Sequence, residues 1–208
     1  MESIEKMISK LFKMKKFAEW DITVDSKPQC LESRRLAAPE LIHKEGDDKH
    51  LYANERLLKQ MPVYSADELS KKTLILFFER RNEGIADNVK KTLMQCQGQM
   101  GMKSRQIQTF MLPDVRHNWA RMEQAVDKYF NQLKQESGVK DNSQYFGLML
   151  LNHENDYPEV KKIFSRLDIM TQCIKSFTAK KMNMSVASNI MKQVNSKVGG
   201  ESLRMKLP

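Results

Sequence analysis

The sequence has few cysteines and no long hydrophobic run, and both absences restrict the classes of protein to which it can belong. Its three cysteines, Cys30, Cys96 and Cys173, are odd in number and widely spaced, which indicates a reducing compartment without a disulfide framework. The longest apolar runs, residues 74–78 and 148–151, are too short to span a bilayer. We therefore expect a cytoplasmic and/or nuclear protein that has no membrane partner.

The short motifs that mark many α/β enzymes are also absent. The sequence contains no G-x-G-x-x-G, no G-x-x-x-x-G-K-[ST] and no G-x-S-x-G. A nucleophilic group could be assembled from Asp156, His153 and Cys173, but nothing in their spacing demands one. The histidines are scattered without a metal-ligand pattern: His43, His50, His117 and His153.

Charge is distributed unevenly along the chain. The formal net charge is +9, and residues 155–208, with ten basic and four acidic side chains, carry +6 of it. An excess of this kind favours a polyanionic partner. An ordinary solvated lysine face is the alternative that charge alone leaves open.

From residue 73 onward, apolar β-prone runs alternate with amphipathic segments of helical period. The runs at residues 73–79, 107–112, 145–151 and 169–177 predict strands, and those at 85–100, 119–133, 157–167 and 182–198 predict helices. Such alternation predicts an α/β protein, a Rossmann-like three-layer domain with a mainly parallel four-stranded sheet. Weak alternation at residues 202–207 predicts the start of a further strand.

The first seventy residues have no sustained period. They combine a basic amphipathic opening at residues 4–12, an extended piece at 20–24 and a polar stretch at 44–49. We therefore predict two parts, an irregular linker segment with a short helix and strand at 1–70 and a domain at 71–208.

An aromatic residue and a basic residue follow the predicted third strand. Tyr157 and Lys161 are four apart and share a face of the helix that begins after the loop at residues 152–156. Ligands of parallel sheets collect at the carboxyl ends of the strands. We expect Lys161 in the first helical turn, where free backbone N–H groups and the helix dipole favour an anion.

A second polar set lies in the predicted fourth strand and last helix. The amide of Gln172 can donate hydrogen bonds without adding charge, and Cys173 beside it is expected to fill space. Gln193 and Lys197 are four apart on a polar stripe of the last helix, just before Gly199-Gly200.

Taken in order, Tyr157-x3-Lys161, Gln172-Cys173 and Gln193-x3-Lys197 resemble the pocket with which the MID domain of Argonaute and Piwi proteins holds the 5′-phosphate of a guide RNA. The Argonaute branch usually has lysine where this chain has Gln193, so the resemblance is to the Piwi branch. It implies that Tyr157, Lys161, Gln172, Gln193 and Lys197 anchor the 5′-monophosphorylated end of a small guide RNA, of the piRNA type in RNA-mediated silencing. It also implies that the chain has no catalytic residues of its own.

The same resemblance implies partners and a metal ion. Mg²⁺ is expected to bridge the 5′-phosphate near Gln193, with help from the terminal carboxylate of the complete protein. A PAZ domain is expected before Met1 and the nuclease-like Piwi domain after Pro208, in a monomeric protein. The tetrapeptide Glu19-Trp20-Asp21-Ile22 resembles the start of the linker before the MID domain. Uridine is the expected first base, read by the loop at residues 152–156.

Two other interpretations remain. One is a Rossmann-like enzyme that uses a nucleotide, and the other is a protein-interaction module that uses the amphipathic N-terminal segment.

Overall fold

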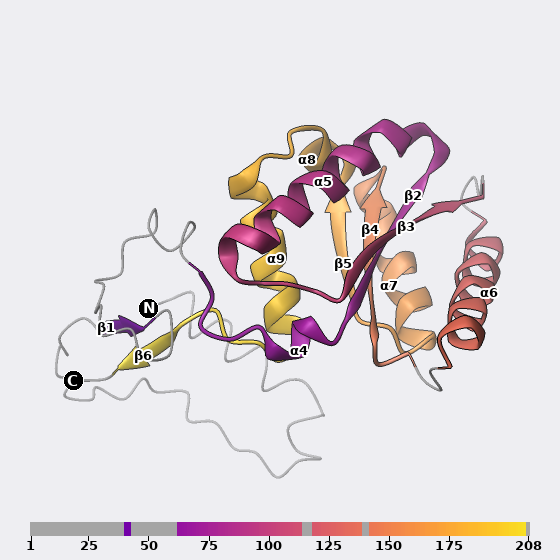
Figure 1. Cartoon of the computed structure of the whole chain (residues 1–208). Coiled ribbons are helices and arrows are strands. Elements are labelled where there is room, and N and C mark those ends of the chain that lie inside the picture. Colours follow the sequence, from indigo (N-terminus) through magenta and orange to yellow (C-terminus); the bar gives the residue numbers. More distant parts are fainter. Residues whose placement is uncertain (1–39, 43–61, 114–117, 139–141, 207–208) are drawn as a thin grey trace, which may run out of the picture. The chain divides into compact units, whose positions relative to one another are not determined.

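The computed structural model describes residues 40–42, 62–113, 118–138 and 142–206 (Figure 1). The chain divides between Ala37 and Ala38, and all described residues belong to the C-terminal unit. The amphipathic opening, the extended piece at 20–24 with its linker-like tetrapeptide, and the polar stretch at 44–49 lie outside the described residues. Among the helices that are described, none has the length and apolarity needed to cross a membrane.

Four parallel strands form the main sheet, in the order β3-β2-β4-β5. They are β2 (Thr73–Glu79), β3 (Gln106–Leu112), β4 (Tyr145–Leu151) and β5 (Thr171–Lys175). The two central strands are the continuous apolar runs, because a strand covered on both faces has no solvent side to make polar. The predicted α/β class and parallel sheet are confirmed.

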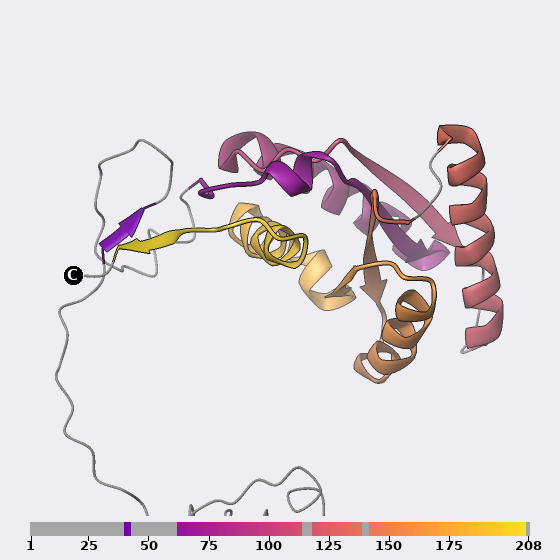
Figure 2. The same cartoon turned by 90° about the horizontal axis from the view of Figure 1, so that it is seen from below.

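Helices cover both faces of this sheet (Figures 1 and 2). On one side lie α5 (Glu83–Met100), α8 (Ser176–Lys180) and α9 (Met184–Lys197), and on the other α6 (Trp119–Ser137) and α7 (Tyr157–Arg166). Alternate residues of β2 point to the two layers. Leu74 and Leu76 join one apolar cluster with α5 and α9, whereas Ile75 and Phe77 join the other with α6 and α7.

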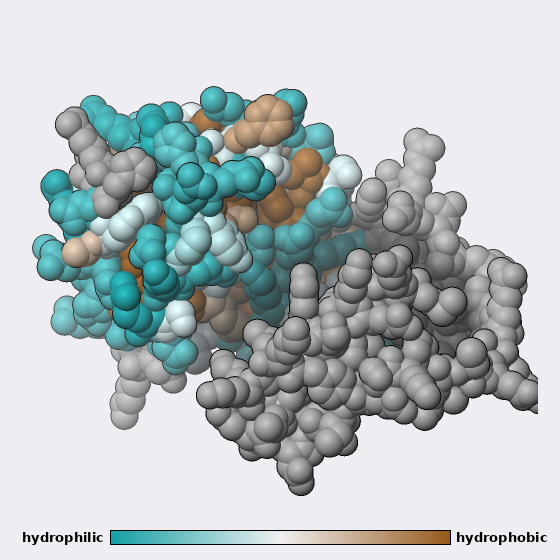
Figure 3. Space-filling view, turned by 180° about the vertical axis from the view of Figure 1, so that it is seen from behind, coloured by the Kyte–Doolittle hydropathy of each residue, from teal (hydrophilic) through white to brown (hydrophobic). Residues whose placement is uncertain are grey.

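Figure 3 shows one face of the molecule, on which hydrophilic side chains predominate and hydrophobic ones gather in a few small areas. Most apolar residues of the four strands lie in the two core layers. Met111 of the edge strand β3 is an exception, with 48 % of its surface exposed.

The fourth strand is shorter than the sequence predicts. It covers Thr171–Lys175, while Asp168, with a φ of 53°, turns the chain before it. The end of the predicted strand instead forms the short helix α8, which buries Ala179. The last helix starts at Met184, where the Asn183 side chain accepts a hydrogen bond from the Val186 N–H (3.0 Å).

The end of α9 is tied to the segment before β2. Gly199 has a φ of 91°, and a Cβ at Gly200 would lie 2.1 Å from the Asn195 Oδ1, so glycine is required at both positions. The Asn195 amide donates to the Ser65 carbonyl (2.9 Å). Val63 and Leu69 lie in the core, so residues 62–70, predicted as linker, contribute to this domain.

Two further elements complete the described part of the chain. The four-residue helix α4 (Asp67–Ser70) precedes β2. The strands β1 (Glu40–Ile42) and β6 (Arg204–Lys206) pair antiparallel, so the strand start predicted at residues 202–207 is present. Its partner lies more than 160 residues earlier in the chain, a pairing that no local pattern reveals.

Candidate phosphate-binding site at the edge strand

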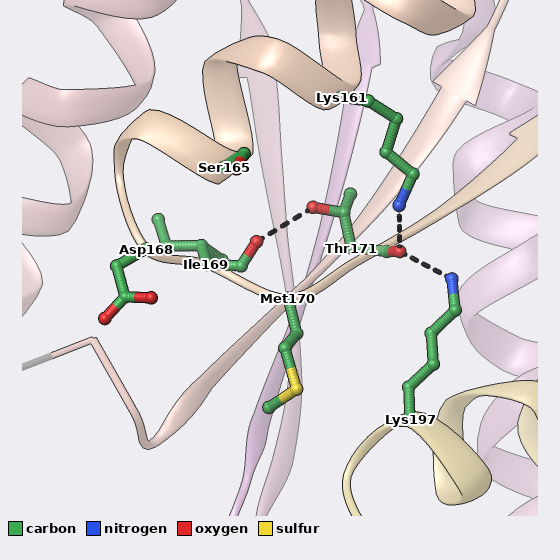
Figure 4. Close-up of a pocket in the computed structure, with 7 residues that line it drawn as sticks. All are labelled: Lys161, Ser165, Asp168, Ile169, Met170, Thr171 and Lys197. Atoms are coloured by element: carbon green, nitrogen blue, oxygen red, sulfur yellow. Dashed lines mark hydrogen bonds between the residues drawn. The ribbon is translucent and has the colours of Figure 1, made fainter. Parts of the chain in front are cut away.

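Two lysines meet at the edge strand β5, one from each helical layer. Lys161 of α7 and Lys197 of α9 both donate to the carbonyl oxygen of Thr171, with Nζ–O distances of 2.6 and 2.8 Å (Figure 4). The preceding carbonyl, that of Met170, accepts from the Gly147 N–H of β4 (2.9 Å). Because carbonyls alternate along a strand, the Thr171 carbonyl points away from the sheet, where both lysines can reach it.

The packing of α7 brings Lys161 to this position. The helix buries Val160, Ile163 and Phe164 against the sheet. A Cβ at Gly147 of β4 would lie 2.8 Å from the Phe164 ring, so glycine there allows the close approach of helix and sheet. Lys161 follows Val160 directly and therefore stands at the margin of the buried face, beside β5.

Lys197 is placed in the same way by α9. That helix buries Ile190, Met191 and Val194 in the other core layer, and Lys197 is its last residue. A cation in the last turn of a helix is favoured by the helix dipole. The glycine turn that follows fixes the end of the helix, so the backbone position of Lys197 is fixed as well.

A cavity of about 520 Å³ opens beside the two ammonium groups. Its lining comes from α7, the loop before β5 and the end of α9: Lys161, Ser165, Asp168, Ile169, Met170, Thr171 and Lys197 (Figure 4). The cavity thus lies at the amino end of β5, not at the carboxyl ends of the strands as expected. Lys161 is the fifth residue of α7, just beyond the first turn, and the backbone N–H groups of that turn contribute nothing to the lining.

The electrostatic environment of the cavity is positive. Within the described part of the chain, neither Lys161 nor Lys197 forms an ion pair with a carboxylate. Burial lowers the pKa of Lys197, and the neighbouring charge of Lys161 lowers it further. Asp168 lines the cavity, but in Figure 4 its carboxylate points away from the two ammonium groups.

Gln172 belongs to the same group of contacts. Its Oε1 accepts from the Lys197 Nζ (2.8 Å) and its amide nitrogen donates to the Cys173 carbonyl (3.1 Å). Gln172 therefore orients Lys197. Burial raises the pKa of the Cys173 thiol, with the charge of Lys161 opposing the shift, so the thiol is neutral and acts as a space-filling group.

Gln172 is not part of the lining of the cavity, and the other two predicted residues also lie outside it. Tyr157 begins α7 at the carboxyl end of β4 and is 49 % exposed. The Lys161 Nζ lies 5.9 Å from the centre of its ring. Gln193 is exposed on α9, one turn before Lys197. The structure thus brings together Lys161, Gln172 and Lys197, with Tyr157 beside Lys161 and Gln193 more distant.

Three cavity groups were missed by sequence reasoning. Ser165 lies four residues after Lys161 on the same helical face, so the helical period could have found it. The Asp168 side chain and the Thr171 carbonyl had no sequence signal, because a backbone acceptor exists at every residue. Among the described residues, no three His, Cys, Asp or Glu side chains stand together as a metal site.

Comparison with known proteins supports the resemblance seen in the motifs. A family model for the Piwi domain matches residues 146–208. Piwi-like protein 1 of Danio rerio is 24 % identical over 198 residues, which is 91 % of this chain and 21 % of that protein. The chain thus spans about a fifth of the length of this relative.

Solved structures with a similar fold include Piwi and Argonaute proteins. The crystal structure of Drosophila Piwi aligns over 84 % of this chain and 24 % of its own, with a TM-score of 0.63 and 18 % identity. The structure of Kluyveromyces polysporus Argonaute with a guide RNA covers 83 % of this chain and 22 % of its own, with a TM-score of 0.50 and 12 % identity. The fold, the motifs and the family match agree in their similarity to an Argonaute-type MID region. The chain is thus similar to proteins of the Argonaute/Piwi family.

Proposed function

We propose that this chain anchors the 5′-monophosphorylated end of a small guide RNA, with the phosphate in the cavity between α7 and α9. One observation carries the proposal: two ammonium groups converge on a single carbonyl oxygen, and no carboxylate of the described residues pairs with them. Similarity to Argonaute and Piwi proteins supports the choice of RNA, as does the guide RNA in the Kluyveromyces polysporus Argonaute structure.

The charges of the site suit this ligand. A phosphate monoester carries about −1.5 to −2 at neutral pH, which matches the two positive charges of Lys161 and Lys197. Phosphate oxygens would replace the Thr171 carbonyl as acceptors for both lysines. Each charge-assisted hydrogen bond is worth about 1.5–3 kcal/mol. A bound dianion also screens one ammonium group from the other, so binding should raise the pKa of Lys197.

The first base is proposed to stack on Tyr157. Its half-exposed ring beside Lys161 would add about 1–3 kcal/mol of stacking. The loop that follows β4 would then face the base edge, and its first residue is fixed, because the Asn152 Oδ1 accepts from the Asn82 amide (2.8 Å). Discrimination by one or two such hydrogen bonds is modest, on the order of 1 kcal/mol each.

Mg²⁺ is part of the proposal only together with phosphate. The Gln193 amide oxygen is a suitable ligand type, and Mg²⁺ commonly binds through few protein groups, substrate phosphates and retained waters. A single amide oxygen cannot hold the ion alone, so the metal should enter with the 5′-phosphate. When bound, it would supply positive charge that Gln193, in the place of a lysine, lacks.

In the full-length protein, we propose that this region works beside a PAZ domain and a Piwi nuclease domain, in a monomer in the cytoplasm or nucleus. The chain itself would bind and not react. The rest of the guide RNA would extend from this site to those domains.

The proposal is tested by titrating the whole chain with uridine 5′-monophosphate and with uridine. We expect the nucleotide to bind at least about tenfold more tightly, since two charge-assisted contacts depend on the phosphate. Titration with the other three nucleoside monophosphates should give several-fold weaker binding for CMP and GMP. Equal affinity for UMP and uridine would exclude the proposed phosphate site. Equal affinity for all four nucleotides would exclude the proposed reading of the base by the loop.

A further inference from the structure

The two edges of the main sheet differ in how their backbone groups are used. At β5, the carbonyls of Thr171 and Cys173 accept hydrogen bonds from side chains, namely the two lysines of the cavity and Gln172. The other edge is β3, a strand of seven residues that pairs, among the described residues, with β2 alone. Within the described part of the chain, one edge is thus covered by side chains and the other is open.

The register of the sheet shows which groups of β3 point outward. The Thr73 N–H donates to the Gln144 carbonyl just before β4 (2.8 Å), so the backbone groups of Thr73 face β4 and those of Leu74 face β3. Leu74 pairs with Ile107, and in a parallel pair the residue opposite a bonded one turns its own N–H and carbonyl away. The backbone groups at the outer edge therefore belong to every second residue: Ile107, Thr109 and Met111.

Strand β3 lacks the features that usually protect an edge strand from pairing. Those features are charged residues, proline, bulges and short length. Residues 106–112 contain no charged residue and no proline, and their register with β2 is unbroken over the whole strand. By contrast, β5 has five residues and ends at Lys175. The composition and length of β3 thus permit a further strand to pair with it.

On the α5 side, this edge offers exposed apolar groups. The Gln97 amide of α5 donates to the Ser104 Oγ just before β3 (2.8 Å), so that face of the helix, with Met94 one turn earlier, lies toward the strand. Met111 pairs with Phe78, which belongs to the core layer of α5. Met94 and Met111 are 54 % and 48 % exposed, and flexible methionine side chains suit contacts with apolar partners.

On the α6 side, the same edge is polar. A cavity of about 230 Å³ beside the amino half of β3 has Arg105, Gln108 and Glu136 in its lining. The Gln108 Oε1 accepts from the Tyr129 hydroxyl (3.1 Å). Side chains of a paired strand alternate between the two faces of a sheet. The edge therefore suits a strand with apolar residues toward α5 and hydrogen-bonding residues toward α6.

The charge near this edge is positive. Residues 88–112 contain four basic residues and no acidic residue: Lys90, Lys91, Lys103 and Arg105. Two of them, Lys103 and Arg105, are exposed just before β3, and the Arg105 Nη1 donates to the neutral Gln144 amide oxygen (2.9 Å). A second copy of this chain would double the positive charge at the interface, whereas an acidic segment would be attracted.

We propose that β3 binds an extended segment of a protein partner by strand addition. The segment runs antiparallel to β3, alternates apolar and polar residues, and has acidic residues at its carboxyl end. Antiparallel pairing is slightly more stable than parallel pairing, and it places that end beside Lys103 and Arg105. The phosphate cavity lies at the opposite edge of the sheet, so the inference is independent of the proposed function.

The test uses the whole chain and two fluorescent octapeptides, acetyl-Thr-Val-Thr-Val-Thr-Val-Glu-Glu-amide and the same peptide ending in Lys-Lys. In anisotropy titrations the acidic peptide should bind about tenfold more tightly. Arg105→Glu should remove that preference, whereas Lys162→Glu, at an exposed lysine of α7, should leave it unchanged.

A pair of substitutions at Thr109 tests the backbone contact. Thr109→Pro removes an outward N–H that the pairing with β2 does not use, a change that edge strands tolerate. It should weaken the acidic peptide roughly fivefold, the loss of one backbone hydrogen bond. Thr109→Val keeps the N–H and should bind the peptide as the natural chain does. Equal affinity in the two variants would overturn the proposal.

Methylation of the peptide nitrogens tests the pairing without any change in the protein. Every second N–H of an added strand points to its neighbour. Methylating one alternate set of nitrogens should therefore abolish binding, and methylating the other set should leave it largely intact. The proposal is overturned if neither peptide binds, or if the two methylated sets lose equal affinity. It is also overturned if the chain self-associates and Thr109→Pro abolishes the association, which would assign the edge to a second copy.

Discussion

Lys161 and Lys162 are neighbours in the sequence and differ in nearly every property that matters for a ligand. Lys162 points to solvent and pairs with Glu159 one turn earlier on α7 (2.6 Å). Lys161, about 100° further round the helix, reaches the Thr171 carbonyl together with Lys197. Lys162 is neutralised within its own helix. Lys161 adds to a positive charge that no carboxylate among the described residues compensates.

The comparison separates surface charge from site charge. An exposed ion pair such as Lys162–Glu159 contributes about 0–1 kcal/mol to stability and leaves no field for a ligand. Two ammonium groups on one carbonyl repel each other. Burial lowers the pKa of Lys197, and this repulsion lowers it further. The basic excess of residues 155–208 is therefore of two kinds, and only the second is suited to binding an anion.

Charge reversal at the two neighbouring lysines should give the largest contrast. Lys161→Glu removes a contact and places a carboxylate beside the phosphate, so UMP affinity should fall by about a hundredfold or more. Lys162→Glu makes the same change in net charge one residue away and should stay within about twofold. The affinities are measured by calorimetric titration at one salt concentration. Similar losses in both variants would mean that general charge, and not the cavity, binds the nucleotide.

A third positive charge at the site should sharpen the comparison further. Gln193→Lys would supply, as a side-chain ammonium group, the positive charge that Mg²⁺ is proposed to bring with the phosphate. In a protein with the complete C-terminus, a chelator should weaken UMP binding about tenfold or more, the worth of one charge-assisted contact. Gln193→Lys should abolish that sensitivity. The control is Gln172→Lys, which would add a charge without removing the proposed metal ligand. Indifference of the natural chain to chelator would exclude the metal.

Alkaline pH should distinguish Lys197 from an ordinary lysine. Its pKa is lowered from 10.5, so the ammonium group loses its proton at a lower pH than an exposed lysine does. Because the charge of the phosphate changes little above about pH 8, UMP affinity should fall by about tenfold or more as the pH rises toward 10.5, the loss of one charged contact. Lys197→Arg, whose charge persists, should flatten the decline. A decline of the same size and position in that variant would assign it to another group.

The smallest expected effect concerns stability. A lysine with a lowered folded-state pKa disfavours folding while it is charged, so stability should increase as pH rises from that pKa to the unfolded value of 10.5. Lys197→Met should remove this increase and raise the free energy of unfolding at neutral pH, by no more than about 0.5 kcal/mol. Lys162→Met, which loses only the pair with Glu159, should show no gain. Chemical denaturation of the three proteins measures the difference, and a loss of stability in Lys197→Met would contradict the proposed repulsion.

Much of the fold could be predicted because its signals are local. Strands β2 and β4 are uninterrupted apolar runs, and helices α5 and α6 show the helical period over four or more turns. The turn after β5 was missed, because Ile174 and Phe177 continue the apolar look of a strand into α8. Phe177 is in fact exposed, and sequence alone does not distinguish an apolar side chain in the core from one in solvent.

The sequence by itself determined the parallel α/β architecture and the spacings that place Lys161 and Lys197 on chosen faces of their helices. Both follow from periods of 2 and 3.6 residues, which any short window of the chain contains. Only the tertiary structure decided that these lysines meet, and that they meet at the amino end of β5. That outcome depends on β5 being the edge strand, on the outward direction of the Thr171 carbonyl, and on Gly147 letting α7 approach the sheet. Each of these is a relation between residues far apart in the chain, set by how the core packs and by which strand has no further neighbour.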